Sequence, residues 1–112
     1  MSVRIENKGD VVTAYLEGEL DHHNAKAIRE DVDAALDRHS PGLLVLDFRE
    51  ITFMDSSGIG LVMGRYKKLQ GTGAQIHITG TSPPIYKVMQ IAGLSKLANI
   101  DKGGKTLEKT AE

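Results

Sequence analysis

Strand-like and helix-like segments alternate along nearly all of this 112-residue sequence. In three helix-like segments the apolar residues recur every three or four positions, and the strand-like segments between them are short apolar or alternating runs. Lys8-Gly9-Asp10 separates the first two strand-like runs as a hairpin turn. The predicted order is therefore β-β-α-β-α-β-α-β, and right-handed crossovers make the later strands parallel. We expect one α/β domain over residues 1–112, with a four- to five-stranded, mostly parallel sheet flanked by helices.

Turn and cap residues define the bounds of these segments. Ser40-Pro41-Gly42 ends the first helix, Gly71 and Gly73 end the second, and Thr81-Ser82-Pro83 begins the third. Asn24 is expected to cap the first helix. The predicted strands are residues 3–7, 11–17, 43–46, 75–79 and 97–101, and the predicted helices are about 24–39, 56–70 and 83–92. Residues 19–23 are predicted to form a polar loop, residues 47–52 to lead away from the sheet, and residues 103–112 to form a polar tail.

The second and third helices are each predicted to bury one apolar stripe. In the second helix the stripe consists of Ile59, Val62, Met63, Tyr66 and Leu69. In the third helix it consists of Ile85, Val88 and Met89. A small basic patch on the second helix, interpreted as a solvated face, consists of Arg65, Lys67 and Lys68.

Charge and composition exclude several classes of function. The formal net charge of −1 gives no general attraction to nucleic acid or to an anionic membrane. The sequence has no cysteine, which excludes disulfides, thiolate metal sites and cysteine nucleophiles. No run approaches the roughly 20 apolar residues that cross a bilayer, and the first residues lack the apolar core of a signal peptide. We therefore expect a soluble cytoplasmic protein that contacts neither nucleic acid nor membrane directly.

The most informative segment for function is Phe53-Met54-Asp55-Ser56-Ser57-Gly58, where a strand-like run passes directly into a helix. The start of a helix leaves backbone N–H groups unpaired and carries a partial positive charge. A phosphate on either serine would meet this favourable helix end, yet it would also add negative charge to an exposed corner. The segment is predicted to be either a phosphorylation switch or an ordinary helix cap.

Residues 19–23 should lie close to this turn. They follow the second strand, and residues 53–58 follow the third. Loops that leave the carboxyl ends of parallel strands gather at the same edge of a sheet. The two distinctive polar segments of the chain are therefore expected to be neighbours in space.

Catalytic chemistry is not favoured by the residues at this edge. Ser56 or Ser57 as a hydrolase nucleophile would need an oriented base, and the sequence lacks Gly-x-Ser-x-Gly and any residue obviously placed to orient His22 or His23. Adjacent histidines in one loop rarely bind one metal ion, and the two glycines that follow Ser57 match only a fragment of a phosphate loop. We expect no enzyme activity, no metal and no cofactor.

Phe53 and Met54 flank the polar turn, and two interpretations of them stay open. In the first, the pair fills the core beneath the turn. In the second, Met54 forms an exposed apolar contact for a protein partner, together with Ile59 or Leu61, because methionine adapts well to such surfaces.

Three motifs in this sequence resemble those of a known family. They are Gly18-Glu19-Leu20-Asp21-His22-His23, Phe53-Met54-Asp55-Ser56-Ser57-Gly58-Ile59-Gly60 and Gly64-Arg65-Tyr66-Lys67. In order and spacing they look like those of bacterial anti-sigma factor antagonists of the sporulation type, the founding kind of STAS domain (sulphate transporter and anti-sigma factor antagonist). The similarity extends from Val3 to about Asn99, and it implies a sheet of four or five strands flanked by helices.

The resemblance also implies a regulatory cycle. The unphosphorylated antagonist would bind an anti-sigma factor that is itself a serine kinase carrying ATP or ADP and Mg²⁺, and would thereby release a sigma factor. The kinase would phosphorylate Ser56, and the phosphorylated antagonist would dissociate from it. A serine phosphatase acting on phospho-Ser56 would restore the antagonist. The implied partner-binding residues are Asp21, His22, Met54, Asp55, Ser57, Gly58 and Ile59.

Individual roles follow from proximity and from the resemblance. Asp55 is expected to orient or recognise the Ser56 hydroxyl, whereas the Ser57 hydroxyl is expected to cap the helix. The protein is expected to be a monomer or a weak dimer. Two related functions stay open, namely a STAS module of a stress-response partner-switching circuit and a nucleotide-sensing STAS domain.

Overall fold

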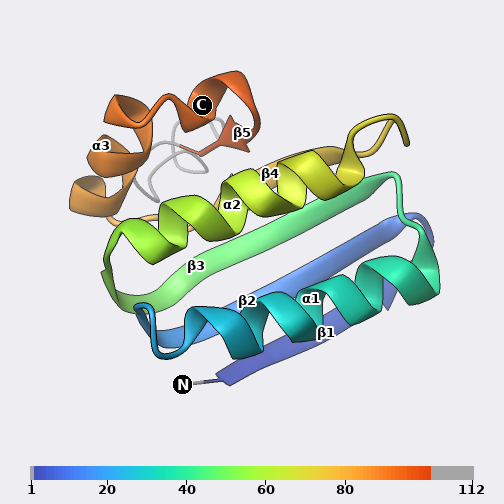
Figure 1. Cartoon of the computed structure of the whole chain (residues 1–112), viewed down its shortest axis with the longest axis horizontal. Helices are drawn as coiled ribbons and strands as arrows, with labels where there is room; N and C mark the ends of the chain where they lie inside the picture. Colours follow the sequence, from blue (N-terminus) through green and yellow to red (C-terminus); the bar gives the residue numbers. More distant parts are fainter. Residues whose placement is uncertain (1, 102–112) are drawn as a thin grey trace, which may run out of the picture.

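A computed structural model of the protein describes residues 2–101, and the polar tail predicted at 103–112 lies outside these residues. The chain forms a five-stranded sheet with helices packed on it (Figure 1). The elements in chain order are β1 Ser2–Lys8, β2 Val11–Leu20, α1 Ala25–His39, β3 Leu43–Met54, α2 Ser56–Leu69, β4 Gln75–Thr79, α3 Pro83–Ile91, a 3-10 turn at Leu94–Lys96, and β5 Asn99–Ile100. The predicted order of strands and helices is confirmed.

The strands lie in the order β1-β2-β3-β4-β5, with β1 antiparallel to β2 and every later pair parallel. Each right-handed crossover advances in the same direction, so successive helices are placed on the same face of the sheet. Helices α1 and α2 accordingly lie side by side across one face (Figure 1). Alternate residues of the central strands point into this core, as shown by the fully buried pairs Val12 with Leu44 and Ala14 with Leu46.

Strands β2 and β3 are longer than predicted. Residues 19 and 20 belong to β2 rather than to a polar loop, and Leu20 is fully buried. Residues 47–52 continue β3 instead of leaving the sheet, because they pair with β2 up to the Leu20–Met54 position. The register shifts on both sides of Gly18, whose φ of 101° favours glycine. These irregularities interrupt the alternation of apolar and polar residues from which strands are predicted. The predicted lengths of β2 and β3 were therefore too short.

Both predicted helix stripes are partly wrong. Met63 and Val88 are about half exposed, whereas the basic residue Arg65 is buried against α1. The buried residues of α2 are Gly58, Leu61, Val62, Arg65 and Leu69. Lys67 and Lys68 are exposed as predicted, so Arg65 alone leaves the supposed basic patch. At the other end of the sheet, β5 is shorter than predicted and begins only at Asn99.

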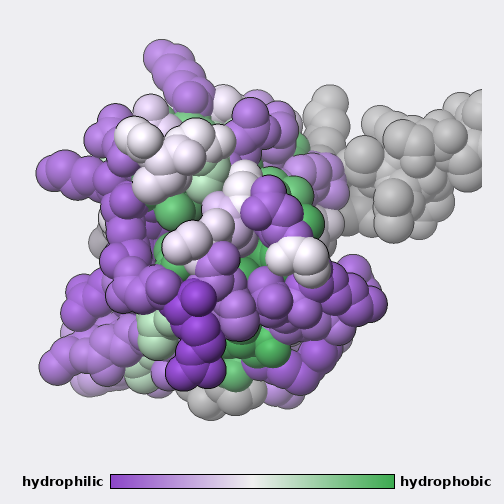
Figure 2. Space-filling model, turned by 90° about the vertical axis from the view of Figure 1, so that its right-hand side faces the viewer, coloured by the Kyte–Doolittle hydropathy of each residue, from purple (hydrophilic) through white to green (hydrophobic). Residues whose placement is uncertain are grey.

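The end of the molecule at which β3 and β4 begin is predominantly hydrophilic (Figure 2). In Figure 1 the β1–β2 hairpin turn and the connections from α1 to β3 and from α2 to β4 gather there. Within residues 2–101 no helix is both long enough and apolar enough to span a bilayer. The distinctive residues of the sequence lie at the opposite end of the strands.

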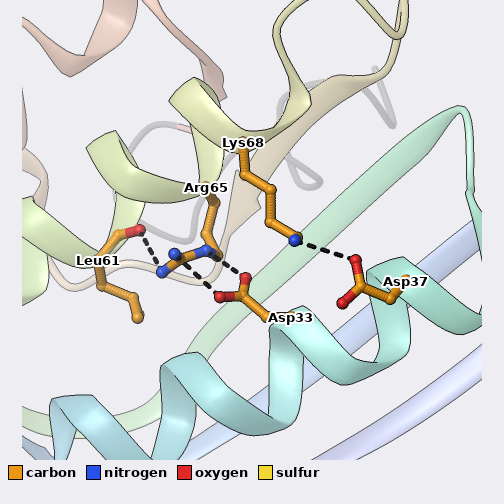
Figure 3. A network of polar contacts seen from close by, with 5 residues as sticks. All are labelled: Asp33, Asp37, Leu61, Arg65 and Lys68. Carbon is orange, nitrogen blue, oxygen red and sulfur yellow. Dashed lines mark hydrogen bonds and ion pairs between the residues drawn. The ribbon is translucent and has the colours of Figure 1, made fainter.

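An ion pair in the helix layer joins α1 to α2 (Figure 3). Arg65 Nε lies 2.8 Å from Asp33 Oδ1, and a second guanidinium nitrogen donates to Asp33 Oδ2 at 3.3 Å. The third nitrogen donates to the Leu61 carbonyl at 3.2 Å. Burial lowers the pKa of Arg65, and the nearby Asp33 charge opposes that effect. The buried guanidinium of Arg65 stays charged at neutral pH, and Asp33 compensates that charge.

Removing the Asp33 carboxylate should lower the stability of the fold. Asp33→Ala leaves Arg65 as an uncompensated buried charge, and we expect a loss of about 3 kcal/mol in the free energy of unfolding. Asp37→Ala is the matched control, since Asp37 is 70% exposed where it pairs with Lys68, and its loss should be within about 1 kcal/mol. Urea denaturation of both variants measures the difference. Equal effects would contradict the structural role of the buried pair.

Three glycines of α2 occupy different environments. A Cβ on Gly58 would overlap the Met54 side chain and approach Leu20 Cδ2 to 3.1 Å. A Cβ on Gly60 or Gly64 would meet nothing within 4 Å. Glycine is thus required by internal packing at the first position and not at the other two.

Alanine substitutions should separate these glycines. Gly60→Ala and Gly64→Ala should each raise the free energy of unfolding by about 1 kcal/mol, because alanine is the better helix former. In Gly58→Ala, overpacking that costs about 1–3 kcal/mol should cancel or exceed that gain. Urea titrations compare the three variants with the wild-type chain. Stabilisation by Gly58→Ala equal to that of the other two would show that Met54 moves aside freely.

Candidate functional site

The carboxyl ends of β2 and β3 meet at one edge of the sheet and hold the candidate site. Leu20 is paired with Met54 in the register, and the Asp55 N–H donates to the Leu20 carbonyl at 3.2 Å. The segments after the two strands, residues 21–24 and 55–58, consequently lie beside each other. The predicted proximity of the two polar segments is confirmed.

Asp55 is the N-cap residue of α2. Its backbone is extended, and its Oδ1 accepts a hydrogen bond from the Ser57 N–H at 2.8 Å. The Ser57 backbone N–H lowers the pKa of Asp55 and is the largest effect on it. Desolvation opposes this effect, and the Ser57 hydroxyl, the His22 backbone and the His22 charge each lower the pKa by smaller amounts. The carboxylate is therefore ionised at neutral pH, and it bonds Ser57 rather than the preceding serine.

Ser56 is the first residue of α2, and its side chain is exposed. Ser57 is half-buried, and its N–H is held by Asp55. The cap is therefore supplied by the Asp55 carboxylate, and the prediction that the Ser57 hydroxyl caps the helix is wrong. Of the two hydroxyls, that of Ser56 is the more accessible to another protein.

Asp21 organises the start of α1 in a similar way. Its Oδ1 accepts hydrogen bonds from the His23 and Asn24 N–H groups, both at 3.1 Å, and its carbonyl accepts from the Ala25 N–H at 2.8 Å. Asn24 occupies the N-cap position but does not cap through its side chain, which donates to the Glu19 carbonyl at 2.9 Å. The prediction that Asn24 caps α1 through its side chain is therefore wrong, and the Asp21 carboxylate instead orders the turn that precedes the helix. His22 is exposed, with its ring 4.0 Å from that of His23.

Neither interpretation left open by the sequence describes the turn: Phe53 does not fill the core, and Met54 does not form an exposed contact with Ile59 or with Leu61, which is buried. Met54 is half-buried and packs against the core, where it covers Gly58. Phe53 is 49% exposed. It lies in the part of β3 that extends past its pairing with β4, which ends at Asp47, and no local pattern indicates that exposure. Ile59 is half-buried, so Phe53 adds apolar surface that the sequence did not single out.

A protein-family model described as the STAS domain matches residues 2–109. The match covers most of the sequence, and the chain belongs to the STAS domain family. The fold described above is therefore that of a STAS domain.

The sequence is also similar to individual relatives and to solved structures. The chain is 33% identical to the anti-sigma F factor antagonist of Paenibacillus polymyxa over 100 residues, covering 89% of this chain and 86% of the relative. It is 27% identical to the anti-sigma-B factor antagonist of Listeria monocytogenes over 103 residues, covering 89% and 90%. Among solved structures, the anti-sigma factor antagonist SpoIIAA in its unphosphorylated form superposes with a TM-score of 0.72 at 27% identity, covering 98% and 96%. The Bacillus SpoIIAA in its phosphorylated form superposes with a TM-score of 0.70 at 29% identity, covering 97% and 99%.

The Asp55 cap should make stability depend on pH in a defined direction. Because folding lowers the pKa of Asp55 below its ordinary value of 3.8, the carboxylate stabilises the fold above that value, and this stabilisation is lost as the pH falls through the lower folded-state pKa. We expect Asp55→Ala to unfold at lower urea concentration than the wild type at pH 7. The difference between the two should shrink by about pH 2.5. A difference of the same size at both pH values would contradict the charged cap.

Proposed function

We propose that this chain is an anti-sigma factor antagonist and that phosphorylation of Ser56 switches off its binding to an anti-sigma factor kinase. The observation that carries the proposal is the exposed Ser56 hydroxyl on the first turn of α2, next to the ionised Asp55. Similarity to the anti-sigma F factor antagonist of Paenibacillus polymyxa and to both forms of SpoIIAA supports it. In this proposal the chain is a substrate and a binding protein, while the kinase supplies ATP and Mg²⁺.

The phosphorylation step is an in-line transfer. Ser56 Oγ attacks the γ-phosphorus of ATP, and the bond from that phosphorus to the oxygen bridging the β- and γ-phosphates breaks. The hydroxyl proton passes to a base of the kinase, and ADP is the leaving group. A serine phosphatase reverses the modification, with water cleaving the phosphate ester to give Ser56 and inorganic phosphate.

Electrostatics at the turn account for release. The phosphate brings about −1.5 to −2 charges at neutral pH. Because Asp55 already occupies the Ser57 N–H, the incoming phosphate adds to a carboxylate rather than filling an empty helix end. Asp21 carries a second carboxylate on the neighbouring turn. A kinase surface matched to the unmodified edge therefore meets a concentrated negative charge, and each 1.4 kcal/mol of resulting repulsion or desolvation weakens binding about tenfold.

Exposed and half-buried residues of the edge form the proposed contact surface. His22, Asp21 and Asp55 supply its polar part, and Phe53 with Ile59 supplies apolar area. Met54 and Gly58 act beneath the surface, because Met54 packs over a glycine that leaves room for it. The higher identity to the anti-sigma F than to the anti-sigma-B factor antagonist favours a sporulation-type circuit over a stress-response circuit.

Phosphate mapping tests the proposed switch. After incubation with the anti-sigma factor kinase encoded in the same genome, ATP and Mg²⁺, mass spectrometry should find one phosphate, on Ser56. Ser56→Ala should take up none, and the matched control Ser57→Ala should still be modified. In a pull-down, Ser56→Asp should retain less than about a tenth of the kinase that the unmodified chain retains.

Two results would count against the switch. One is phosphate on another residue with undiminished uptake by Ser56→Ala. The other is equal retention of the kinase by the unmodified chain and by Ser56→Asp. Circular dichroism of each variant checks that the fold persists.

A further inference from the structure

A groove of about 490 Å³ runs between α1 and α2 and opens beside the proposed contact surface. On the α2 side, Ser57, Gly60 and Gly64 line it, and His22 lies at the end near the Ser56 turn. The spacing of the glycines is one helical turn, so both lie on the side of α2 that faces this groove. The groove is therefore continuous with the surface at which phosphorylation is proposed to act.

The charged side chains that line the groove are basic. They are Lys26 and Arg29 of α1 and Arg65 of α2, and the described residues that line the groove include no acidic side chain. Arg65 is neutralised by Asp33, and Lys26 is 4.0 Å from Glu30 in an exposed pair. None of the ion pairs found within residues 2–101 involves Arg29. The groove thus offers the Arg29 cation, which none of these ion pairs neutralises, opposite two glycines of α2.

The glycines have no explanation in the packing of the chain itself. A Cβ at Gly60 or Gly64 would meet nothing within 4 Å, whereas a Cβ at Gly58 would overlap Met54. Glycine in the middle of a helix is unfavourable, so it is expected where another backbone must come close. The space above Gly60 and Gly64 is open and belongs to the groove of about 490 Å³.

We propose that this groove receives an acidic segment of the anti-sigma factor kinase, whose backbone approaches α2 at Gly60 and Gly64 and whose carboxylates pair with Lys26 and Arg29. The inference rests on the proposed function and names a second contact for the same partner. We infer an acidic segment from charge complementarity. The cationic lining of the groove attracts carboxylates, whereas the adjoining turn carries the negative charge of Asp55 and does not. Ser57 lines the groove, so a phosphate on the adjacent Ser56 would bring negative charge close to it and repel the acidic segment, which links the groove to the switch.

Calorimetry of the full chain with the kinase and ADP–Mg²⁺ tests the groove directly. Gly60→Leu and Gly64→Leu should each weaken binding by at least about tenfold, because the new side chain fills the space that the segment enters. Gln90→Leu places the same side chain at an exposed position of α3 and should bind like the wild type. Circular dichroism and urea titration of the glycine variants should match the wild type or exceed it in stability.

Charge reversal provides a variant set that does not depend on helix packing. Arg29→Glu should weaken binding by at least about tenfold, and the loss should diminish as the salt concentration rises. Lys87→Glu makes the same change of net charge on α3 and should have little effect. Titration of the free wild-type chain with ATP–Mg²⁺ alone should give no saturable binding that Arg29→Glu removes.

The outcomes distinguish this inference from the proposed function. If the unmodified chain binds the kinase and Ser56→Asp does not, while the glycine and Arg29 variants bind normally, the groove assignment is overturned and the switch stands. If the wild-type chain does not bind the kinase at all, both the groove assignment and the proposed function are overturned. ATP binding that requires Arg29 in the absence of the kinase would overturn the acidic segment in favour of a nucleotide.

Discussion

Parallel pairing between β2 and β3 continues to Leu20 and Met54, and the arrangement of the functional edge depends on it. Had the strands separated after Asp47, where β4 ceases to pair with β3, the two helix starts would not be held side by side. The pairing instead ends with the Asp55 N–H on the Leu20 carbonyl. A backbone constraint thus fixes the separation of two aspartate-capped turns, and the side chains of the turns need little flexibility to act together.

The same edge combines two helix N-termini with two carboxylates that bind backbone N–H groups beside them. Asp55 accepts from the Ser57 N–H in the first turn of α2, whereas Asp21 accepts from the His23 and Asn24 N–H groups that precede α1. A helix start is often an empty anion site, but at α2 the Asp55 carboxylate already occupies one of the N–H groups. The Ser56 hydroxyl therefore lies beside a negative charge, and in the proposed switch a phosphate would add to that charge.

Beneath this edge, the helix layer carries an unusual division of small and charged residues. Arg65 is buried and anchored by Asp33, which ties α2 to α1. Gly60 and Gly64, on the same side of the helix, leave the space beside that anchor open. The buried ion pair and the open groove are thus adjacent, and this arrangement is the basis of the proposal that the groove receives a segment of another chain.

The local sequence determined the order of strands and helices, the positions of the turns and the adjacency of residues 19–23 and 53–58. These features rest on short-range periodicity, on glycine and proline chemistry, and on the handedness of crossovers. Tertiary structure alone decided the length of β2 and β3, the burial of Arg65 and the exposure of Phe53. Each of these depends on which segment lies opposite in space. A strand continues as long as a neighbouring strand pairs with it, and a charged side chain is buried where another helix supplies the opposite charge. That information is not contained in the spacing of residues along one segment.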